Sequence, residues 1–336
     1  MTELNITSSE ANQRLNKYLM KYLDKAPSSF IYKMLRKKNI TLNNKKAVGD
    51  EILEKGDCVK LFLSDETIEK FRNTQNLTKN TKIEKNQSSN CNDLIVLYQD
   101  KDIIAVHKPA GLLSQKANKD DISINEVIID YCIANNLIDV RGSIHFKPSI
   151  CNRLDRNTSG IILAGLSLHG SQYLSKILKE HSCDKYYFTI VNGIFTEKKH
   201  CKAYIIKDSE ANVSDIISTL DYNNLDLSAK KNYNYIETVF EPLSSGDGYS
   251  FLKVKLITGK SHQIRAHLKH LGYPIIGDTK YGSISTNRYF RDKYKLKHHL
   301  LHAGSISFDN LTITDSLPDI FKDICKGEKI NINSIK

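Results

Sequence analysis

Apolar residues recur with two different periods along the chain, which predicts a mixture of helices and strands. Leu15, Leu19 and Leu23 are spaced four residues apart, so this segment is expected to form a helix with one apolar stripe. The segment 28–38 repeats the helical pattern, with apolar residues on one face and basic residues on the other. We therefore expect two amphipathic helices near the start of the chain.

The next residues change from a compact pattern to a polar one. The alternation in Ile40–Leu42 and Cys58–Leu63 predicts short strands that complete a small domain over residues 1–65. Residues 66–92 are dominated by Asn, Thr, Lys, Gln and Ser, a composition that is typical of a flexible polar linker. A second domain is then expected over residues 93–336.

The second domain alternates strand patterns with helix patterns. Apolar runs and turn residues predict a hairpin at its start, and the run Ile161–Ala164 predicts a buried strand. The polar stretch 195–234 is weakly patterned, and we expect strands with long loops there. Further strands are expected at Leu94–Tyr98, Ile103–Val106, Asp184–Gly193, Tyr235–Phe240 and Phe251–Ile257, and helices at Ser123–Asn135, Leu168–Glu180 and from about Ile264 to Gly272.

The composition points to a polyanionic partner. At 336 residues, with 40% hydrophobic and 26% charged residues, the chain matches a soluble protein of two domains. Its formal net charge of +11 favours nucleic acid or an acidic membrane. No apolar run approaches the roughly 20 residues of a membrane span, and Met1–Glu10 lacks an apolar signal core. We therefore expect no membrane association.

Cysteine and histidine usage argues against a metal site. The seven cysteines are scattered and never spaced as Cys-x-x-Cys, which indicates a reduced, cytoplasmic chain. His262, His267 and His270 are close in sequence, but no Asp or Glu lies at ligand spacing and their neighbours are basic. A metal-dependent nuclease is therefore disfavoured, and a basic, histidine-rich helix that faces nucleic acid is the preferred interpretation.

The segment 152–160 carries the most suggestive chemistry. Asp155 lies between Arg153 and Arg156, immediately before the predicted buried strand. A carboxylate between fixed cations is held ionised, so it is available as a nucleophile or base, and the guanidinium groups could bind phosphate. The alternative is an ordinary loop with an Asp–Arg pair and a Thr-Ser-Gly turn, and composition alone favours that alternative.

The order of residues in this segment decides between the two interpretations. Arg153-Leu-Asp155-x-x-Thr-Ser-Gly160 resembles the catalytic signature of the RluA family, the pseudouridine synthases that modify large-subunit ribosomal RNA or transfer RNA. The position before Arg153 is usually His in the family and is Asn152 here. Other segments resemble the family in the same order, namely Lys108-Pro-x-Gly111, Lys185-x-Tyr187 before Gly193, Gly259-Lys-Ser-His-Gln-Ile-Arg265, the segment 274–282 and Leu301-His-Ala303.

The resemblance implies a role for each matching residue. Asp155 is the essential catalytic residue, Arg265 pairs with it, and Tyr187 stacks on the extruded base. Arg153 fills the gap that the base leaves in the RNA stack, and Lys108 approaches either an RNA phosphate or the catalytic loop. The further residues expected to bind substrate are Lys185, His262 and Ile264.

The first domain has a resemblance of its own. Arg14-Leu-x-Lys-Tyr-Leu19 and the segment 35–43 are similar to a small RNA-binding domain that is shared with a small-subunit ribosomal protein, two helices packed on a short sheet. The similarity covers roughly residues 11–63. It implies that the basic helix face contacts RNA, although most charge runs are simply solvated. The residues of this face are Lys33, Arg36, Lys37 and Lys38.

Together these resemblances imply an α+β fold. We expect a mixed, largely antiparallel sheet with flanking helices and a central cleft, plus a small N-terminal α/β RNA-binding domain. The implied enzyme is a monomeric, cytoplasmic isomerase that converts uridines in large-subunit (23S) ribosomal RNA to pseudouridine without cofactor or metal. Transfer RNA is the alternative substrate, and a non-catalytic ribosome-assembly factor is disfavoured because Asp155, Tyr187 and Arg265 are all present.

Overall fold

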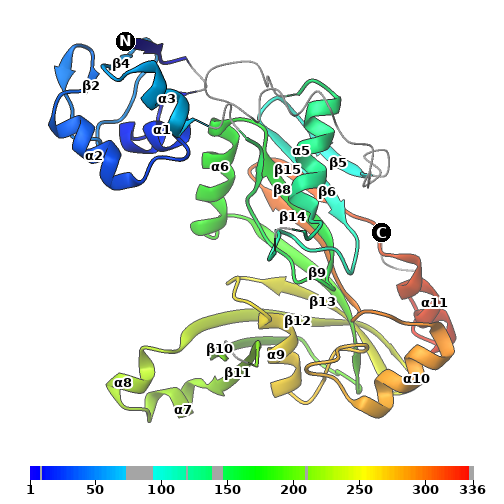
Figure 1. Ribbon diagram of the computed structural model, residues 1–336. Coiled ribbons are helices and arrows are strands. Elements are labelled where there is room, and N and C mark those ends of the chain that lie inside the picture. The colour runs from blue at the N-terminus through cyan, green and yellow to red at the C-terminus, as the bar shows by residue number, and fades with distance from the viewer. Residues whose placement is uncertain (8–9, 73–93, 119, 138–146, 209–210, 333–336) are drawn as a thin grey trace.

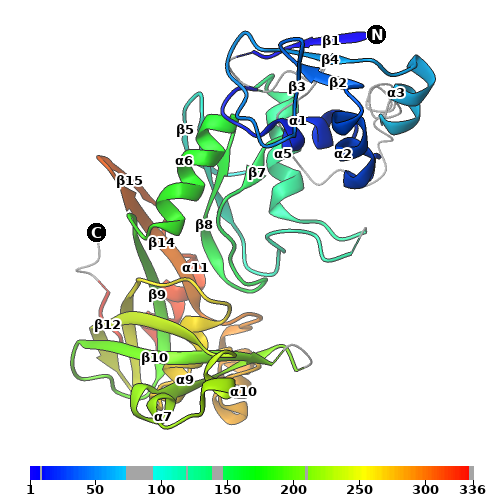
Figure 2. The ribbon, with the colours of Figure 1, turned by 90° about the vertical axis from the view of Figure 1, so that its left-hand side faces the viewer.

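The chain folds into a small N-terminal domain and a larger domain built on one long sheet (Figures 1 and 2). The structure is a computed structural model that describes residues 1–7, 10–72, 94–118, 120–137, 147–208 and 211–332. The α+β prediction is confirmed, since helices flank a sheet that is mixed and largely antiparallel.

The N-terminal domain has its own apolar core. Its sheet has the strand order β1-β4-β2-β3, and the apolar stripe of the first helix is fully buried at Leu15 and Leu19. The elements are β1 (Thr2–Asn5), α1 (Leu15–Tyr22), α2 (Ser28–Arg36), β2 (Ile40–Leu42), β3 (Lys45–Lys46), β4 (Cys58–Leu61) and α3 (Asp65–Phe71).

Helix α3 extends the N-terminal domain beyond its expected end at residue 65. Ser64 caps this helix by accepting a hydrogen bond from the amide of Thr67. Ile68 is buried in the domain core, and the Phe71 ring lies 4.5 Å from that of Phe30, measured between centroids. The prediction that a polar linker begins at residue 66 is therefore wrong, because two apolar residues three apart are enough to dock a short helix. The rest of the expected linker, from residue 73 to 92, lies outside the described residues.

The larger domain contains an eleven-stranded sheet. Its strand order is β11-β10-β12-β13-β9-β14-β8-β6-β5, with β15 paired to β14 and β7 paired to β8. The strands are β5 (Val96–Gln99), β6 (Ile103–Lys108), β7 (Ser149–Ile150), β8 (Ser159–Gly165), β9 (Asp184–Asn192), β10 (Lys199–Asp208), β11 (Val213–Ser218), β12 (Asn234–Gly246), β13 (Tyr249–Leu256), β14 (Leu301–Phe308) and β15 (Leu311–Thr314). Among these, β14 and β8 run parallel and the other paired strands run antiparallel.

Helices cover both faces of this sheet. They are α5 (Ile124–Ala134), α6 (Leu168–Lys179), α7 (Thr219–Asn223), α8 (Leu227–Lys230), α9 (Gln263–His270), α10 (Ile284–Tyr294) and α11 (Asp319–Gly327). The weakly patterned stretch 195–234 holds β10 and β11, as expected, and also the short helices α7 and α8, which its polar pattern did not indicate. Helix α9 packs Ile264 and Leu268 against β12, β13 and β9.

Strand β8 is the buried centre of the upper half of the sheet. Ile162 and Ala164 pack with residues of α5, whereas Ile161 and Leu163 pack with residues of α6, so both faces of the strand are covered. Figure 1 shows β8 with these two helices beside it. A strand that is buried on both faces has a continuous apolar sequence rather than an alternating one. This arrangement explains the apolar run that follows Asp155.

Gly160 allows β8 to lie close to β14. The backbone of Gly160 has φ of +121°, and a Cβ atom built there would lie 2.3 Å from the carbonyl oxygen of Ala303. Ala303 pairs with Gly160 on one side and with Tyr187 of β9 on the other. Gly160, the last residue of the Asp155 segment, therefore allows β8, β14 and β9 to lie side by side at this level of the sheet.

Candidate active site

Asp155 lies on the loop that connects β7 to β8, and several side chains fix this loop. The Ser114 hydroxyl donates to the carbonyl of Leu154 (2.7 Å) and accepts from its amide (3.0 Å). Asn152 donates to the carbonyl of Ile161 (3.1 Å) and accepts from the amide of Leu163 (2.7 Å). Asn152, at the position where the family usually has His, therefore ties the start of the loop to β8.

Lys108 supports the same loop from beneath. Its ammonium group is fully buried and donates to the backbone carbonyls of Pro109 (3.0 Å), Leu112 (2.8 Å) and Arg156 (3.1 Å). Burial lowers the pKa of Lys108 to about 8, although the negative charge of Asp155 acts to raise it. Of the two partners expected for Lys108, the structure gives the catalytic loop. The prediction that it binds RNA phosphate is wrong, because three backbone carbonyls already surround the ammonium group.

Arg265 lies between two carboxylates. Its Nη1 donates to Oδ2 of Asp155 at 2.7 Å, and its Nε and Nη2 donate to Oδ2 and Oδ1 of Asp278 at 2.7 and 2.9 Å. Burial would lower the pKa of Arg265, but the two carboxylates outweigh burial and raise it above its usual range. Arg265 is therefore a fixed cation beside Asp155.

Asp278 is a part of the site that sequence reasoning missed. It is fully buried, and its Oδ1 also accepts from the backbone amides of Lys280 and Tyr281. Burial would raise its pKa, but hydrogen bonds and charge from Arg265 hold the pKa below its usual range. A signal was available, because Asp278 is the only carboxylate between Asp247 and Asp292. A lone acid in a basic segment indicates a buried pair.

The arrangement leaves one oxygen of Asp155 available for chemistry. Arg265 engages Oδ2, while no donor in the described part of the chain is bonded to Oδ1. Neither of the flanking arginines, Arg153 and Arg156, is paired with Asp155 in the described residues. Arg156 instead donates to the carbonyl of Gly111 (3.0 Å), and Arg153 is exposed to solvent. The charge beside Asp155 comes from a helix 110 residues further along the chain.

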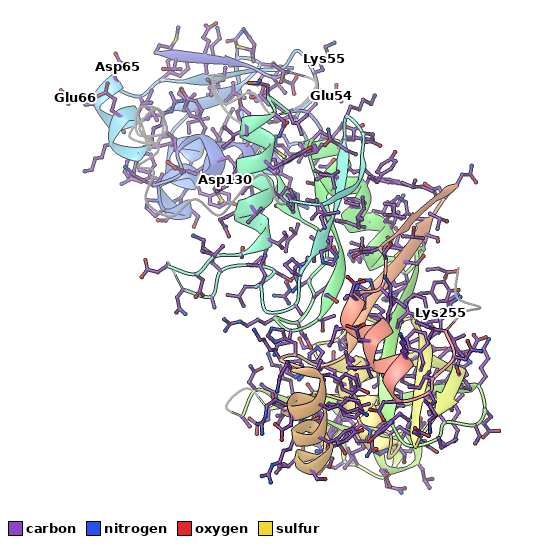
Figure 3. All side chains as sticks on the ribbon, turned by 90° about the vertical axis from the view of Figure 1, so that its right-hand side faces the viewer. Glu54, Lys55, Asp65, Glu66, Asp130 and Lys255 are labelled. Atoms are coloured by element: carbon purple, nitrogen blue, oxygen red, sulfur yellow. The ribbon has the colours of Figure 1, made fainter. Side chains whose placement is uncertain are left out.

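Tyr187 and Tyr186 face opposite sides of β9. Tyr187 is half-buried and faces the cavity above Asp155, and burial raises the pKa of its hydroxyl above its usual range. Tyr186 instead lies beneath Lys253, whose Nζ is 4.4 Å from the ring centroid. Lys255, labelled in Figure 3, also lies over the Tyr186 ring and is paired with Asp184. Of these two tyrosines, the one in the Lys185-x-Tyr187 motif is therefore the one that faces the cavity.

A cavity of about 640 Å³ gathers most of the expected residues. It is lined by Asp155, Tyr187, Arg265, Arg153, Lys185, His262 and Ile264, together with residues of the loops on either side. Lys108 lies below it rather than in its wall. The basic residues Lys33 and Arg36 of helix α2, and Lys37 and Lys38 directly after it, are exposed on the N-terminal domain and do not line the cavity.

The histidines near the site are mostly structural. His267 is 2% exposed, and its ring packs edge-on against Phe240 with the centroids 5.4 Å apart. Burial lowers its pKa to about 4. His299 is also buried, and its Nε2 lies 2.8 Å from the Thr158 hydroxyl of the Asp155 loop. The expectation of a histidine-rich helix face toward RNA is therefore wrong for His267. Within the described residues, no cluster of three or more His, Cys, Asp or Glu side chains could hold a metal.

Comparison with protein families identifies this arrangement. Residues 102–270, half of the chain, match the family described as RNA pseudouridylate synthase. The chain belongs to the RNA pseudouridylate synthase family. The resemblance to the RluA family is thereby confirmed, and the protein is an isomerase that acts on RNA. In the part of the chain that the structure describes, no helix has the length and apolar character needed to cross a membrane.

Individual relatives carry related names. The chain is 28% identical to a ribosomal large subunit pseudouridine synthase C of Buchnera aphidicola subsp. Baizongia pistaciae (strain Bp), over 96% of each chain. It is 31% identical to a tRNA pseudouridine synthase C of Haemophilus ducreyi, over 64% of this chain and 85% of that one. Among solved structures, human RNA pseudouridylate synthase domain containing 4 matches with a TM-score of 0.57 and 18% identity, over 71% of this chain and 94% of that one. This last likeness is one of fold.

Proposed function

We propose that this pseudouridine synthase modifies specific uridines of large-subunit ribosomal RNA, with Asp155 as its catalytic residue. The observation that carries the assignment of Asp155 is its pairing with Arg265 at 2.7 Å in the wall of the cavity described above. The cationic partner is buried, since the Arg265 side chain is 6% exposed, whereas Asp155 keeps 26% of its side chain exposed. We further propose that the enzyme acts in the cytoplasm as a monomer.

The reaction exchanges one bond of the base for another. The N1–C1′ glycosidic bond of uridine breaks, C1′ bonds to C5, and the hydrogen of C5 is lost while N1 gains one. We propose that the free Oδ1 of Asp155 acts on the sugar as nucleophile or base while Arg265 holds Oδ2. The Tyr187 ring would stack on the turned base, and the exposed Arg153 would fill the gap in the RNA stack.

The N-terminal domain favours a ribosomal substrate. The relative named for the large ribosomal subunit is similar over 96% of this chain, a share that must include the N-terminal domain. The relative named for transfer RNA matches 64% of this chain. The exposed cations Lys33 and Arg36 on helix α2, and Lys37 and Lys38 directly after it, are joined by the exposed Lys45 and Lys46 on strand β3. We infer that this basic surface, defined by these six residues, binds RNA at a distance from the target uridine.

We expect purified protein to modify protein-free large-subunit RNA, or early assembly particles, more efficiently than bulk transfer RNA. A second basic domain adds a second contact to a large structured RNA, which raises the effective concentration of the target loop. Assays of the purified protein on the two kinds of RNA measure this preference. Mapping of pseudouridines in cells with and without the protein shows which RNA it modifies there. If deletion cells kept every large-subunit pseudouridine and lost one in transfer RNA, the substrate assignment would be wrong and the chemistry would stand.

Replacing Lys33, Arg36, Lys37 and Lys38 together with Gln should weaken RNA binding without changing the rate on a short saturating substrate. Each lost phosphate contact should reduce the slope of log affinity against log salt by roughly one unit. The matched control replaces four exposed lysines on other elements, Lys101, Lys176, Lys322 and Lys326. Equal slopes for the variant and the unmodified protein would mean that the basic surface is only a solvated helix face.

A further inference from the structure

Tyr281 connects a backbone amide of β11 to a histidine in the wall of the cavity. The tyrosine is 4% exposed, and its hydroxyl oxygen lies 2.6 Å from the amide nitrogen of Ser214 and 3.0 Å from Nδ1 of His262. An amide N–H can only donate a hydrogen bond. The Tyr281 oxygen is therefore the acceptor in its bond with Ser214, and its own hydrogen remains available for His262.

This geometry fixes which nitrogen of His262 carries the proton. Nδ1 of His262 lies 3.0 Å from the Tyr281 hydroxyl oxygen. The Ser214 hydroxyl is a second group beside that oxygen, and it donates its own hydrogen to the carbonyl of Ser261. We assign the Tyr281 hydroxyl hydrogen to Nδ1 of His262. Burial lowers the pKa of His262 below its usual range, so the ring is neutral at pH 7. A neutral imidazole that accepts at Nδ1 has its hydrogen on Nε2.

The Nε2–H group faces the reaction site and has no hydrogen-bond partner among the described residues. Nε2 lies 3.9 Å from Oδ2 of Asp155, which is too far for a hydrogen bond, and Arg265 already occupies that oxygen. His262 has a left-handed backbone, with φ of 57° and ψ of 13°, directly before α9. Its carbonyl accepts from the amide of Ala266 at 2.9 Å, so the helix holds this conformation. Such unfavourable backbone geometry is often kept where a side chain must be aimed.

We propose that Ser214, Tyr281 and His262 form a relay that aims the Nε2–H of His262 at an oxygen of the target nucleotide. The inference rests on the proposed function, because Asp155 acts on the sugar and the donor lies beside Asp155. The ribose side of the nucleotide therefore supplies the acceptor. His262 contacts the substrate, and Tyr281 is a positioning residue that acts through His262.

The test combines kinetics with ¹⁵N NMR of the imidazole groups in the full-length protein. In the unmodified protein, the spectrum should show His262 with its proton on Nε2, assigned by comparison with His262→Gln. Tyr281→Phe keeps the ring beside Arg265 and removes the hydroxyl, so His262 should become a mixture of both tautomers. Tyr98→Phe removes a surface hydroxyl that bonds to Asp100 and should leave the spectrum unchanged.

The substitutions of His262 and Tyr281 should lower kcat/KM through the same interaction with the substrate. His262→Ala should lower kcat/KM by roughly tenfold, the effect of one lost hydrogen bond, and Tyr281→Phe by less. The double variant should match His262→Ala, because Tyr281 acts only through that ring. Rescue of activity by His262→Asn, whose amide can also donate, would support the proposal further.

Two results would overturn the relay. One is a proton on Nδ1 of His262 in an active unmodified enzyme. The other is a loss of kcat/KM in the double variant that equals the product of the losses in His262→Ala and Tyr281→Phe. These results differ from a failure of the proposed function. If the unmodified protein formed no pseudouridine in any RNA, the reaction at Asp155 would be wrong even where the NMR spectrum showed the expected tautomer.

Discussion

Asp155→Asn should eliminate pseudouridine formation, with a loss on the order of 10⁴-fold or more, while the fold and the RNA affinity stay nearly unchanged. An amide is neutral and can be neither a nucleophile nor a base toward the sugar. The substitution is nearly isosteric, and the amide oxygen can still accept the hydrogen bond from Arg265 that now reaches Oδ2. The loop should therefore keep its position, and only the chemistry should be lost.

Release of tritium from uridine labelled at C5 in transcribed RNA measures this loss. Asp130→Asn is a matched control, because Asp130 is an exposed carboxylate on helix α5 (Figure 3) and does not line the cavity. The control should turn over at the rate of the unmodified enzyme. Appreciable tritium release by Asp155→Asn would remove Asp155 from the mechanism.

The local part of the site could be predicted from sequence because local patterns encode it. A continuous apolar run predicts a strand buried on both faces, and β8 is such a strand. The ordered motifs around Asp155, Tyr187 and Arg265 were enough to select residues that line one cavity. These predictions depend on spacing along the chain, which the sequence displays directly.

The remainder depends on contacts between distant segments, which spacing does not display. The cation beside Asp155 was expected from its neighbours Arg153 and Arg156, whereas it comes from Arg265 on α9. Lys108 was expected near phosphate or the loop, and only the folded chain shows that three carbonyls surround it. Partners of this kind are chosen by burial, since a buried charge must be paired wherever the fold places it.

The boundary of the N-terminal domain shows the same limit at a smaller scale. Residues 66–71 look polar in sequence, yet Ile68 and Phe71 lie three apart and supply a docking face for α3. Two apolar residues are too few to distinguish a helix from a linker by periodicity. Whether this segment forms a helix depends on the packing of Ile68 and Phe71 against the core of the N-terminal domain.

Arg265→Leu should both inactivate and destabilise the enzyme. The substitution removes the cation that holds Oδ2 of Asp155, and it leaves the fully buried Asp278 without its paired charge. Breaking a buried pair from one side costs about 3–5 kcal/mol of unfolding free energy. Chemical denaturation and the tritium assay measure the two effects. Arg265→Lys keeps the charge but loses the fork that contacts both carboxylates, so partial stability with weak activity is expected.

The destabilisation should depend on pH with a definite sign. In the unmodified enzyme the pKa of Asp278 is held below its ordinary value of 3.8, so its stabilising contribution is present above about pH 4 and is lost as the pH falls through the folded pKa. In Arg265→Leu, burial without a partner should instead raise the pKa of Asp278. The stability deficit of the variant should therefore shrink as the pH is lowered toward 4.

A double variant separates the two roles of Arg265. Arg265→Leu combined with Asp278→Asn leaves no unpaired buried charge, and the Asn oxygen can still accept from the amides of Lys280 and Tyr281. The unfolding free energy should recover most of its value, whereas activity should stay lost because nothing holds Asp155. Recovery of activity together with stability would mean that Arg265 serves the fold through Asp278 and is not needed beside Asp155.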